Sequence, residues 1–170
     1  PDVIKLSLNF RSVGSIIKLG NTLLDLKQKL VGLSGGEMRE DWKFNGRPPV
    51  VMTVNNDRQL ASAINLSRAG IVILARNTEE VMKLKAILNS ELVFTVHEMK
   101  GLEFDTVILW KFCSDEKTYQ IWKNIASGKL PDERHKAHIT HEINLFYVAI
   151  TRARNKIIIF DGASPSPIWS

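Results

Sequence analysis

The sequence of 170 residues has a single cysteine, Cys113, so a framework of intrachain disulfides is excluded. A chain with a single cysteine is typical of an intracellular protein, and we expect a location in the cytoplasm. No segment approaches the roughly eighteen consecutive apolar residues of a membrane helix, and the N-terminus lacks the pattern of a signal peptide. We therefore expect no membrane partner. The chain opens abruptly with a strand-like segment after Pro1, which suggests a piece of a longer protein.

Two motifs with well-defined chemistry are also missing. The sequence contains no G-x-x-x-x-G-K-[ST] phosphate loop, and no strand ends in the paired carboxylates that hold Mg²⁺. His135, His138 and His141 recur at every third residue. Side chains that recur at every third residue do not stay on a single helical face over two turns. No carboxylate or cysteine completes a known ligand set. The sequence therefore predicts no metal site.

The composition is that of one ordinary globular domain. The chain is long enough to bury a hydrophobic core and too short for two domains of ordinary size. Hydrophobic residues make up 44% and charged residues 24% of the sequence, which excludes a disordered chain. The net charge of +5 suits a polyanionic partner without proving one.

Strand-like and helix-like segments alternate along the chain. The expected strands are Val3–Leu8, Pro49–Val54, Ile71–Ala75, Leu92–Val96, Phe104–Trp110 and Lys156–Phe160. The expected helices are one that follows Ser12 as its N-cap, then Asp57–Arg68, Glu79–Leu88, Thr118–Ala126 and Ile139–Ala153. We expect loops at Gly32–Pro49 and Gly128–Lys136, and a proline-rich tail at Ala163–Ser170. This alternation predicts an α/β fold with a mainly parallel sheet covered by helices on both faces.

The last helix and strand bring two arginines to one junction. Apolar residues from Ile139 to Ala153 follow the spacing of one buried helical face, and Arg152 and Arg154 stand where this helix gives way to the strand. A guanidinium group is a fixed fork of donors suited to phosphate oxygens. Alternatively, both arginines simply cap the C-terminus of the helix against its dipole. This stretch alone leaves both interpretations open.

Ligands of open parallel sheets bind at the carboxyl ends of the strands. This rule selects three places, which are Asn9–Ser12, Thr95–Phe104 and Tyr147–Arg154. The first puts an aromatic ring and an arginine beside a helix N-terminus, and the second has a glycine that allows close approach of the backbone to a ligand. Together they are parts of a nucleotide site without its phosphate-binding centre.

The same three places carry a family resemblance. LSLNFRS, TVHEMKGLEFDTVIL and NLFYVAITRARNKI resemble motifs IV, V and VI of the UvrD/Rep-like superfamily 1 DNA helicases, in that order. The resemblance implies a second RecA-like domain with three layers over residues 1–162, followed by a tail at 163–170. Only Asn77–Phe94 separates the strand before Arg76 from motif V. We therefore expect this domain to lack the large accessory insertion of well-studied members.

The resemblance also implies roles for single residues near ATP. Arg11 and Arg152 are similar to the two arginines that reach the γ-phosphate of ATP bound by the other RecA-like domain. Phe10 stands where the family usually has a tyrosine that stacks on adenine, and its ring keeps that stacking face. Gly101 matches a glycine near the phosphates. Glu103 matches a glutamate that binds the ribose hydroxyls, and the alternative for it is a solvated loop carboxylate.

Three further residues match positions that contact single-stranded DNA. Thr95 and His97 match contacts to the DNA backbone, although a single histidine is often structural or merely exposed. Arg76 follows the strand IVILA, where the family often has another DNA contact. A surface arginine without a function is the alternative for Arg76.

The resemblance predicts the C-terminal motor half of an ATP-dependent DNA helicase or translocase. Its partners would be single-stranded DNA and an N-terminal RecA-like domain that holds most of the ATP and Mg²⁺, and movement would run 3′ to 5′. The alternatives are a non-catalytic scaffold or nucleic-acid-binding module, and an unrelated α/β enzyme. Two phosphate-directed arginines argue against a scaffold, and the order of the motifs argues against an accidental match.

Overall fold

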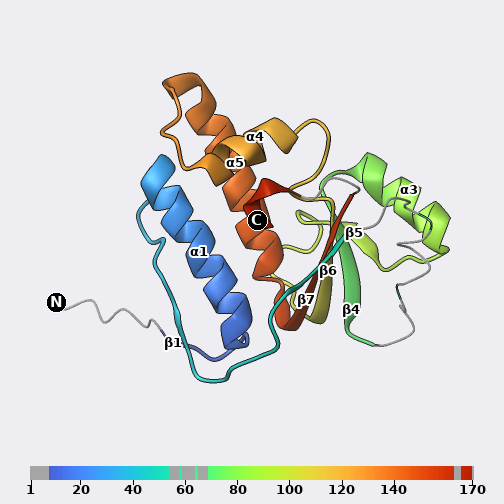
Figure 1. Ribbon diagram of the computed structural model, residues 1–170. Coiled ribbons are helices and arrows are strands. Elements are labelled where there is room, and N and C mark those ends of the chain that lie inside the picture. The colour runs from blue at the N-terminus through green and yellow to red at the C-terminus, as the bar shows by residue number, and fades with distance from the viewer. Residues whose placement is uncertain (1–7, 54–57, 59–63, 65–68, 163–165, 170) are drawn as a thin grey trace.

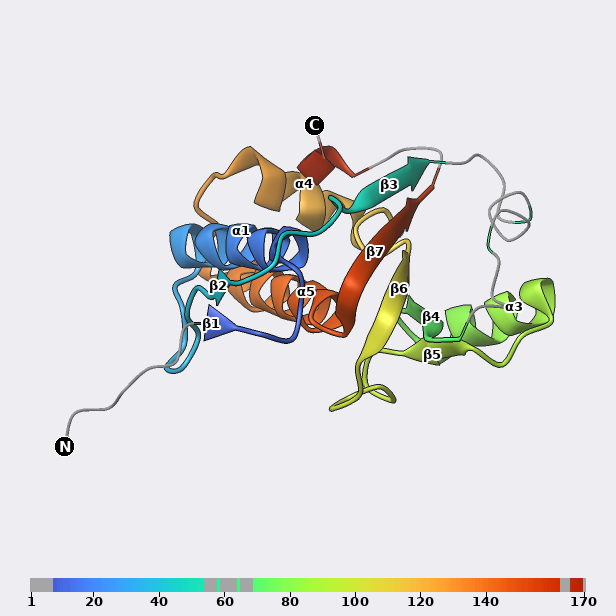
Figure 2. The same cartoon turned by 90° about the horizontal axis from the view of Figure 1, so that it is seen from below.

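A five-stranded sheet forms the centre of the computed structural model, which describes residues 8–53, 58, 64, 69–162 and 166–169. The strand order is β3-β7-β6-β4-β5, and every neighbouring pair is parallel (Figures 1 and 2). The strands are β3 (Val50–Thr53), β4 (Ile71–Ala75), β5 (Val93–Thr95), β6 (Phe104–Trp110) and β7 (Ala153–Asp161). The predicted α/β fold with a parallel sheet is confirmed.

Helices cover both faces of this sheet. On one face lie α1 (Gly14–Leu30), α4 (Tyr119–Ser127) and α5 (Glu133–Ile150), with α1 and α5 side by side. On the other face lies α3 (Thr78–Leu88), as Figure 1 shows. Successive residues of a strand point to opposite faces. Accordingly, Val107 and Leu109 of β6 belong to the larger core under α1, α4 and α5, and Ile108 belongs to the smaller core under α3.

The junction between α5 and β7 differs from the sequence prediction at both ends. The helix begins at Glu133, inside the expected loop, because the Asp132 side chain accepts a hydrogen bond from the His135 N–H and caps the first turn. It ends at Ile150, so Ala153 is the first residue of the strand and not the last of the helix. Arg152 therefore follows the helix instead of lying in its last turn.

In the N-terminal part the structure differs from two further sequence predictions. Ser12 does not cap α1, whose N-cap is Val13. The Ser12 hydroxyl donates to the Ala153 carbonyl at 2.8 Å, which ties motif IV to the start of β7. The expected loop at 32–49 also contains β2 (Asp41–Trp42), which pairs in parallel with β1 (Leu8–Asn9).

Other predictions lie partly or wholly outside the described residues. Of the expected strand at 3–8 only Leu8 is described, and of the expected helix at 57–68 only Arg58 and Ile64. Part of the predicted tail packs on the domain. The short 3-10 helix Pro167–Trp169 lies against α4, and the Trp169 indole donates to the buried Asp161 carboxylate at 2.6 Å. The domain boundary at residue 162 stays a prediction.

None of the helices within the described ranges is both long enough and apolar enough to cross a lipid bilayer.

Candidate functional site

The site residues predicted from sequence lie at two opposite edges of the sheet. Glu103 directly precedes β6, Gly101 lies three residues before its start, and Arg152 directly precedes β7, so these three lie at the amino ends of the strands. Phe104 and Ala153 face each other in the register of β6 and β7, which places both motifs at the same edge. Thr95 instead ends β5 at the carboxyl edge.

The expectation that all three motifs gather at the carboxyl edge is therefore wrong. In a parallel sheet every connection must bring the chain back to the edge from which the strands start. Motif V begins at the carboxyl end of β5 and crosses to the amino end of β6, and α5 makes the same return before β7. The arginines of motif VI consequently reach the amino edge.

An ion-pair cluster joins the three motifs at this amino edge. The Arg11 Nε lies 2.6 Å from Glu103 Oε1, and the Arg154 Nε lies 3.1 Å from Glu103 Oε2. Both arginine side chains are 57% exposed, whereas that of Glu103 is 18% exposed. Glu103 is thus a twice-paired carboxylate and not the solvated loop residue of the alternative interpretation. Sequence reasoning recognised Arg154 as phosphate-directed or capping, but it missed this pairing.

Arg152 lies at the same edge with its guanidinium turned toward main-chain acceptors. Its Nε donates to the Val148 carbonyl at 3.2 Å, in the last turn of α5, and its Nη1 donates to the Leu102 carbonyl at 3.3 Å. This is the capping geometry that the sequence left open for Arg152. It also connects motif VI to the motif V loop, and the role toward phosphate stays a prediction.

Phe10 and Gly101 provide an open surface near the cluster. The Phe10 ring is 66% exposed, with the Lys43 ammonium 5.8 Å from its centroid. Gly101 has φ +82°, a left-handed conformation that side-chain-bearing residues rarely adopt, and the space beside its Cα is open. The open ring face is compatible with stacking on a base, and the roles of both residues stay predictions.

At the start of motif V, Thr95 is engaged in a local hydrogen-bond network. Its backbone N–H and its hydroxyl both donate to Glu98 Oε2, at 2.6 and 2.9 Å. These bonds favour the ionised form, so they hold the pKa of the Glu98 carboxyl below its ordinary value. Thr95 is buried, whereas His97 is exposed. Of the two predicted DNA contacts in this motif, His97 is the side chain open to a ligand.

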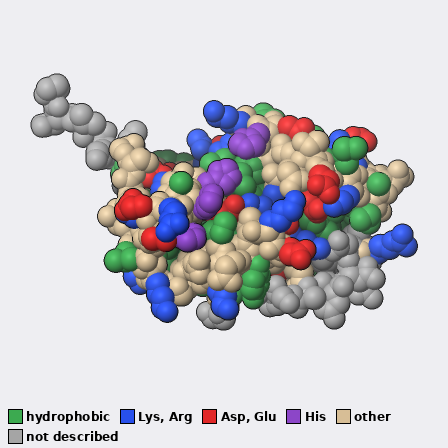
Figure 3. Space-filling model, turned by 90° about the horizontal axis from the view of Figure 1, so that it is seen from above, with side chains coloured by type: hydrophobic (Ala, Val, Ile, Leu, Met, Phe, Trp, Pro, Cys, Tyr) green, Lys and Arg blue, Asp and Glu red, His purple; other side chains and the backbone are tan. Residues whose placement is uncertain are grey.

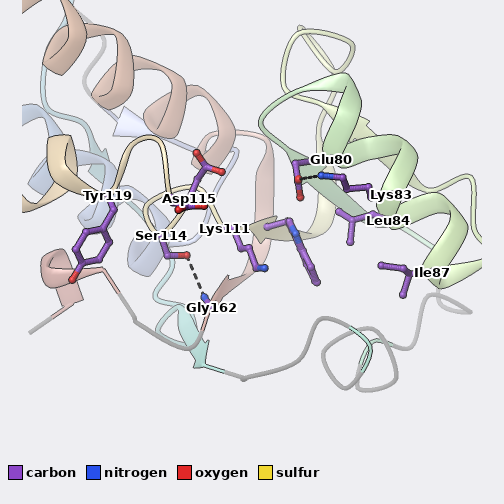
Figure 4. A pocket seen from close by; sticks show the side chains of 11 residues that line it. Glu80, Lys83, Leu84, Ile87, Lys111, Ser114, Asp115, Tyr119 and Gly162 are labelled. Atoms are coloured by element: carbon purple, nitrogen blue, oxygen red, sulfur yellow. Dashed lines mark hydrogen bonds and ion pairs between the residues drawn. The ribbon is translucent and has the colours of Figure 1, made fainter.

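A cavity of about 710 Å³ opens at the carboxyl edge, between α3 and the segment that follows β6 (Figure 4). Its charged lining residues have both signs, including Lys83 paired with Glu80 at 3.2 Å. Ser114 accepts a hydrogen bond from the Gly162 N–H there, also at 3.2 Å. The cavity contains none of the predicted site residues, and its mixed lining favours no particular ligand. We therefore place the candidate site at the amino edge and not in this cavity.

Comparison with known proteins assigns the family. The model of the UvrD-like helicase C-terminal domain matches residues 69–161, which is more than half of the chain. The chain belongs to this family. The predicted resemblance to UvrD-like superfamily 1 helicases is therefore confirmed at the level of the domain.

Two other similarities describe the relatives of this UvrD-like C-terminal domain. It is 29% identical, over 90% of its length, to the human TPR and ankyrin repeat-containing protein 1, and it spans 7% of that protein. It also resembles a solved structure, the C-terminal domain of a possible DNA helicase from Lactobacillus plantarum WCFS1, with a TM-score of 0.60. This second match has 18% identity and covers 95% of this chain and 92% of the other, so it supports the fold alone.

Within the UvrD-like domain, Arg76 has internal partners. Its Nη2 lies 2.6 Å from Glu142 Oε1, and its Nη1 donates to the Phe112 carbonyl at 2.7 Å. The other Glu142 oxygen accepts from the Trp122 indole at 3.1 Å. The Arg76 side chain is 11% exposed, so the alternative of a surface arginine is wrong. The DNA contact of Arg76 stays a prediction.

Sequence reasoning missed Glu142 altogether. It occurs on the largely buried side of α5, between Ile139 and Ile143, and a lone carboxylate among apolar residues of a helix was the available signal. Within the part of the chain that the structure describes, no three His, Cys, Asp or Glu side chains lie together as a metal site would require.

Proposed function

We propose that this domain is the C-terminal motor half of an ATP-dependent DNA helicase or translocase. It would supply arginines to ATP that an N-terminal RecA-like domain binds, and it would contact single-stranded DNA. The observation that carries the proposal is the convergence of Arg11, Glu103, Arg152 and Arg154 at one edge of the sheet. Three motifs far apart in the sequence contribute them.

Arg11 and Arg152 would act on the γ-phosphoryl group. Arginine supplied across a domain interface stabilises the negative charge that develops during phosphoryl transfer, and it acts mainly on the rate. In the described state Glu103 pairs with Arg11. A triphosphate arriving at this edge would compete with Glu103 for Arg11, and Arg154 would remain as a partner for the carboxylate.

The cluster of Arg11, Glu103 and Arg154 is unsuited to hold Mg²⁺ by itself. Guanidinium groups cannot ligate a cation, and both Glu103 oxygens lie against arginines. This supports a motor in which the N-terminal domain holds most of the metal, which would neutralise charge on the phosphates. Phe10 would stack on the adenine ring, Gly101 would allow approach to the phosphates, and Glu103 would bind the ribose. His97, Thr95 and Arg76 would serve the DNA side.

A non-catalytic module is the second candidate. The observation that favours it is the geometry of Arg152, whose guanidinium caps α5 and bridges to the motif V loop. In such a protein the arginines would stabilise the junction of motifs V and VI, and nucleic-acid binding would not depend on ATP.

The chain of residues 1–170 by itself should show no DNA-stimulated ATP hydrolysis, because it has no phosphate loop to hold the nucleotide. A phosphate-release assay with and without single-stranded DNA measures this directly. The longer protein that contains the chain serves as the positive control. Robust turnover by residues 1–170 alone would contradict the assignment as half of a motor. Failure of the longer protein to hydrolyse ATP would instead favour the non-catalytic module.

Binding of single-stranded DNA by residues 1–170 should be weak and strongly dependent on salt. The domain provides half of a binding groove with a modest basic excess, so contacts to phosphates and release of counterions should dominate. We expect the association constant to fall about tenfold or more between about 50 and about 200 mM salt. Fluorescence anisotropy with a labelled oligonucleotide tests this, and sub-micromolar binding unchanged at high salt would contradict it.

A further inference from the structure

Strand β7 has a bulge at its start. Its register against β6 shifts by one residue there, so Arg154 and Asn155 both lie opposite the single residue Asp105. A bulge of this kind changes the direction in which side chains leave the strand. As a result two consecutive side chains reach acidic partners on the other strand segment. Arg154 pairs with Glu103, and the Asn155 amide donates to the Asp105 carboxylate.

The main chain holds Arg154 close to Arg11. The Val13 N–H donates to the Arg154 carbonyl at 2.9 Å, and the Ser12 hydroxyl donates to the Ala153 carbonyl at 2.8 Å. Figure 2 shows the segment after β1 reaching the start of β7. The main chain of both arginines is therefore fixed, and a change of ion-pair partner requires only their side chains to move.

The side chains of the cluster share one carboxylate between two arginines. Arg11 occupies one oxygen of Glu103 and Arg154 occupies the other, and both arginines are far more exposed than the carboxylate. Two guanidinium groups against one carboxylate leave an excess of positive charge, which attracts anions. On the face shown in Figure 3, by contrast, acidic and basic side chains lie interspersed without a concentration of either sign.

The two arginines play different parts when a triphosphate arrives. If the γ-phosphate takes Arg11, Glu103 loses the partner of one oxygen and keeps Arg154 at the other. Without Arg154 the same exchange would leave an unpaired carboxylate next to the phosphates. Like charges held close together disfavour binding, and Glu103 would therefore retain Arg11 more strongly.

We infer that Arg154 is a positioning residue that sets how readily Glu103 releases Arg11, and thereby how strongly the site prefers a nucleoside triphosphate to a diphosphate. The inference rests on the proposed function and deepens it. A diphosphate has no γ-phosphate for Arg11, so it binds without separating Arg11 from Glu103. Only a triphosphate has to break that pair, and Arg154 lowers the free energy required because it keeps the carboxylate paired.

The test measures this preference at equilibrium in the full-length protein. Isothermal titration calorimetry with Mg²⁺ gives the affinities for ADP and for the non-hydrolysable ATP analogue adenylyl imidodiphosphate, and their ratio is the preference for the triphosphate. Arg154→Ala should lower this ratio about two- to fivefold, the size expected of one exposed ion pair. The affinity for ADP should stay unchanged, and thermal melts check the fold.

A double variant shows whether Arg154 acts through Glu103. Glutamine keeps a carbonyl oxygen as an acceptor but has no charge. In a Glu103→Gln background, Arg154→Ala should therefore leave the ratio unchanged. A loss of the same size in that background would indicate a direct contact of Arg154 with the nucleotide and would overturn the inference. Arg154→Lys, which keeps the positive charge, should retain most of the preference.

Asn155→Ala is the matched control, because Asn155 belongs to the same bulge and pairs with Asp105 instead of Glu103. It should keep the wild-type ratio, and an equal drop there would assign the effect to the bulge and overturn the inference. An unchanged ratio in Arg154→Ala would also overturn it while leaving the proposed function intact. Failure of the wild-type protein to bind either nucleotide would overturn the proposed function together with the inference.

Discussion

Replacing Arg152 with alanine in the full-length protein should lower the rate of ATP hydrolysis by a factor of about 10³–10⁵, the range found for arginines supplied in trans. The affinities for ATP and for single-stranded DNA should change much less. The helix before Arg152 is anchored by buried residues, and the strand after it, β7, lies between β3 and β6 in the interior of the sheet. The guanidinium is therefore held on a rigid base at the edge where Arg11 and Glu103 also lie.

The size of the effect separates the two interpretations of Arg152. As a cap of α5, through the bond to the Val148 carbonyl, its charge would contribute about 0.3–1 kcal/mol of stability. As a group that stabilises charge building on the γ-phosphoryl group, it would act on turnover and not on ground-state binding. Arg152→Lys should not restore the rate, because lysine offers a point charge in place of a planar fork.

Steady-state kinetics and thermal melts of both variants decide between these interpretations. Arg134→Ala is a suitable control, since Arg134 is an exposed arginine at the other end of the same helix. It should keep wild-type turnover. If Arg152→Ala retains near wild-type turnover, or loses activity only in proportion to lost folded protein, the arginine is a structural cap and the proposed role is wrong.

The second large effect is expected at Glu142. Replacing it with alanine should lower the free energy of unfolding by about 3–5 kcal/mol, the usual cost of removing one partner from a buried ion pair. The change leaves Arg76 Nη2 and the Trp122 indole N–H without their acceptor, and the largely buried Arg76 charge without its carboxylate partner. Urea unfolding of residues 1–170 measures the difference. Glu142→Gln should lose less than alanine, because the amide oxygen can still accept a hydrogen bond.

An exposed ion pair provides the control for Glu142. Lys83 pairs with Glu79 at 2.9 Å, and its side chain is 57% exposed. Lys83→Ala should therefore cost far less stability than Glu142→Ala, because solvent screens an exposed ion pair. The same assay on Arg76→Ala should give a loss comparable to that of Glu142→Ala. Stability near wild type in Glu142→Ala would show that this ion pair does not support the core.

Local patterns in the sequence predicted much of the fold. Ile71–Ala75 and Phe104–Trp110 are strands with the expected bounds, because segments rich in apolar and β-branched residues suit a sheet that is covered on both faces. The helix at Thr78–Leu88 was recognised from its periodicity to within one residue. Such features depend on neighbouring residues, so the sequence alone suffices to find them.

The residues at which helices begin were harder to predict from the sequence. Ser12 has the chemistry of an N-cap, but its hydroxyl bonds to Ala153, a residue 141 positions away. Helix α5 begins inside the expected loop because the Asp132 side chain caps its first turn. The charged composition of that segment had favoured a loop. In both cases the end of the helix depended on which hydrogen-bond partner a side chain has in the folded protein.

The sequence by itself determined the fold class and the family motifs, because these depend on residue types at short spacing, and the roles of the site residues stay predictions. Only the tertiary structure decided that the arginines of motifs IV and VI meet at the amino edge of β6 and β7. It alone decided that Glu103 lies between Arg11 and Arg154, and that Arg76 turns inward to Glu142. These pairings join residues 51 to 92 positions apart. The physical reason is that the return paths of parallel connections set which loops share an edge, and no local pattern encodes those paths.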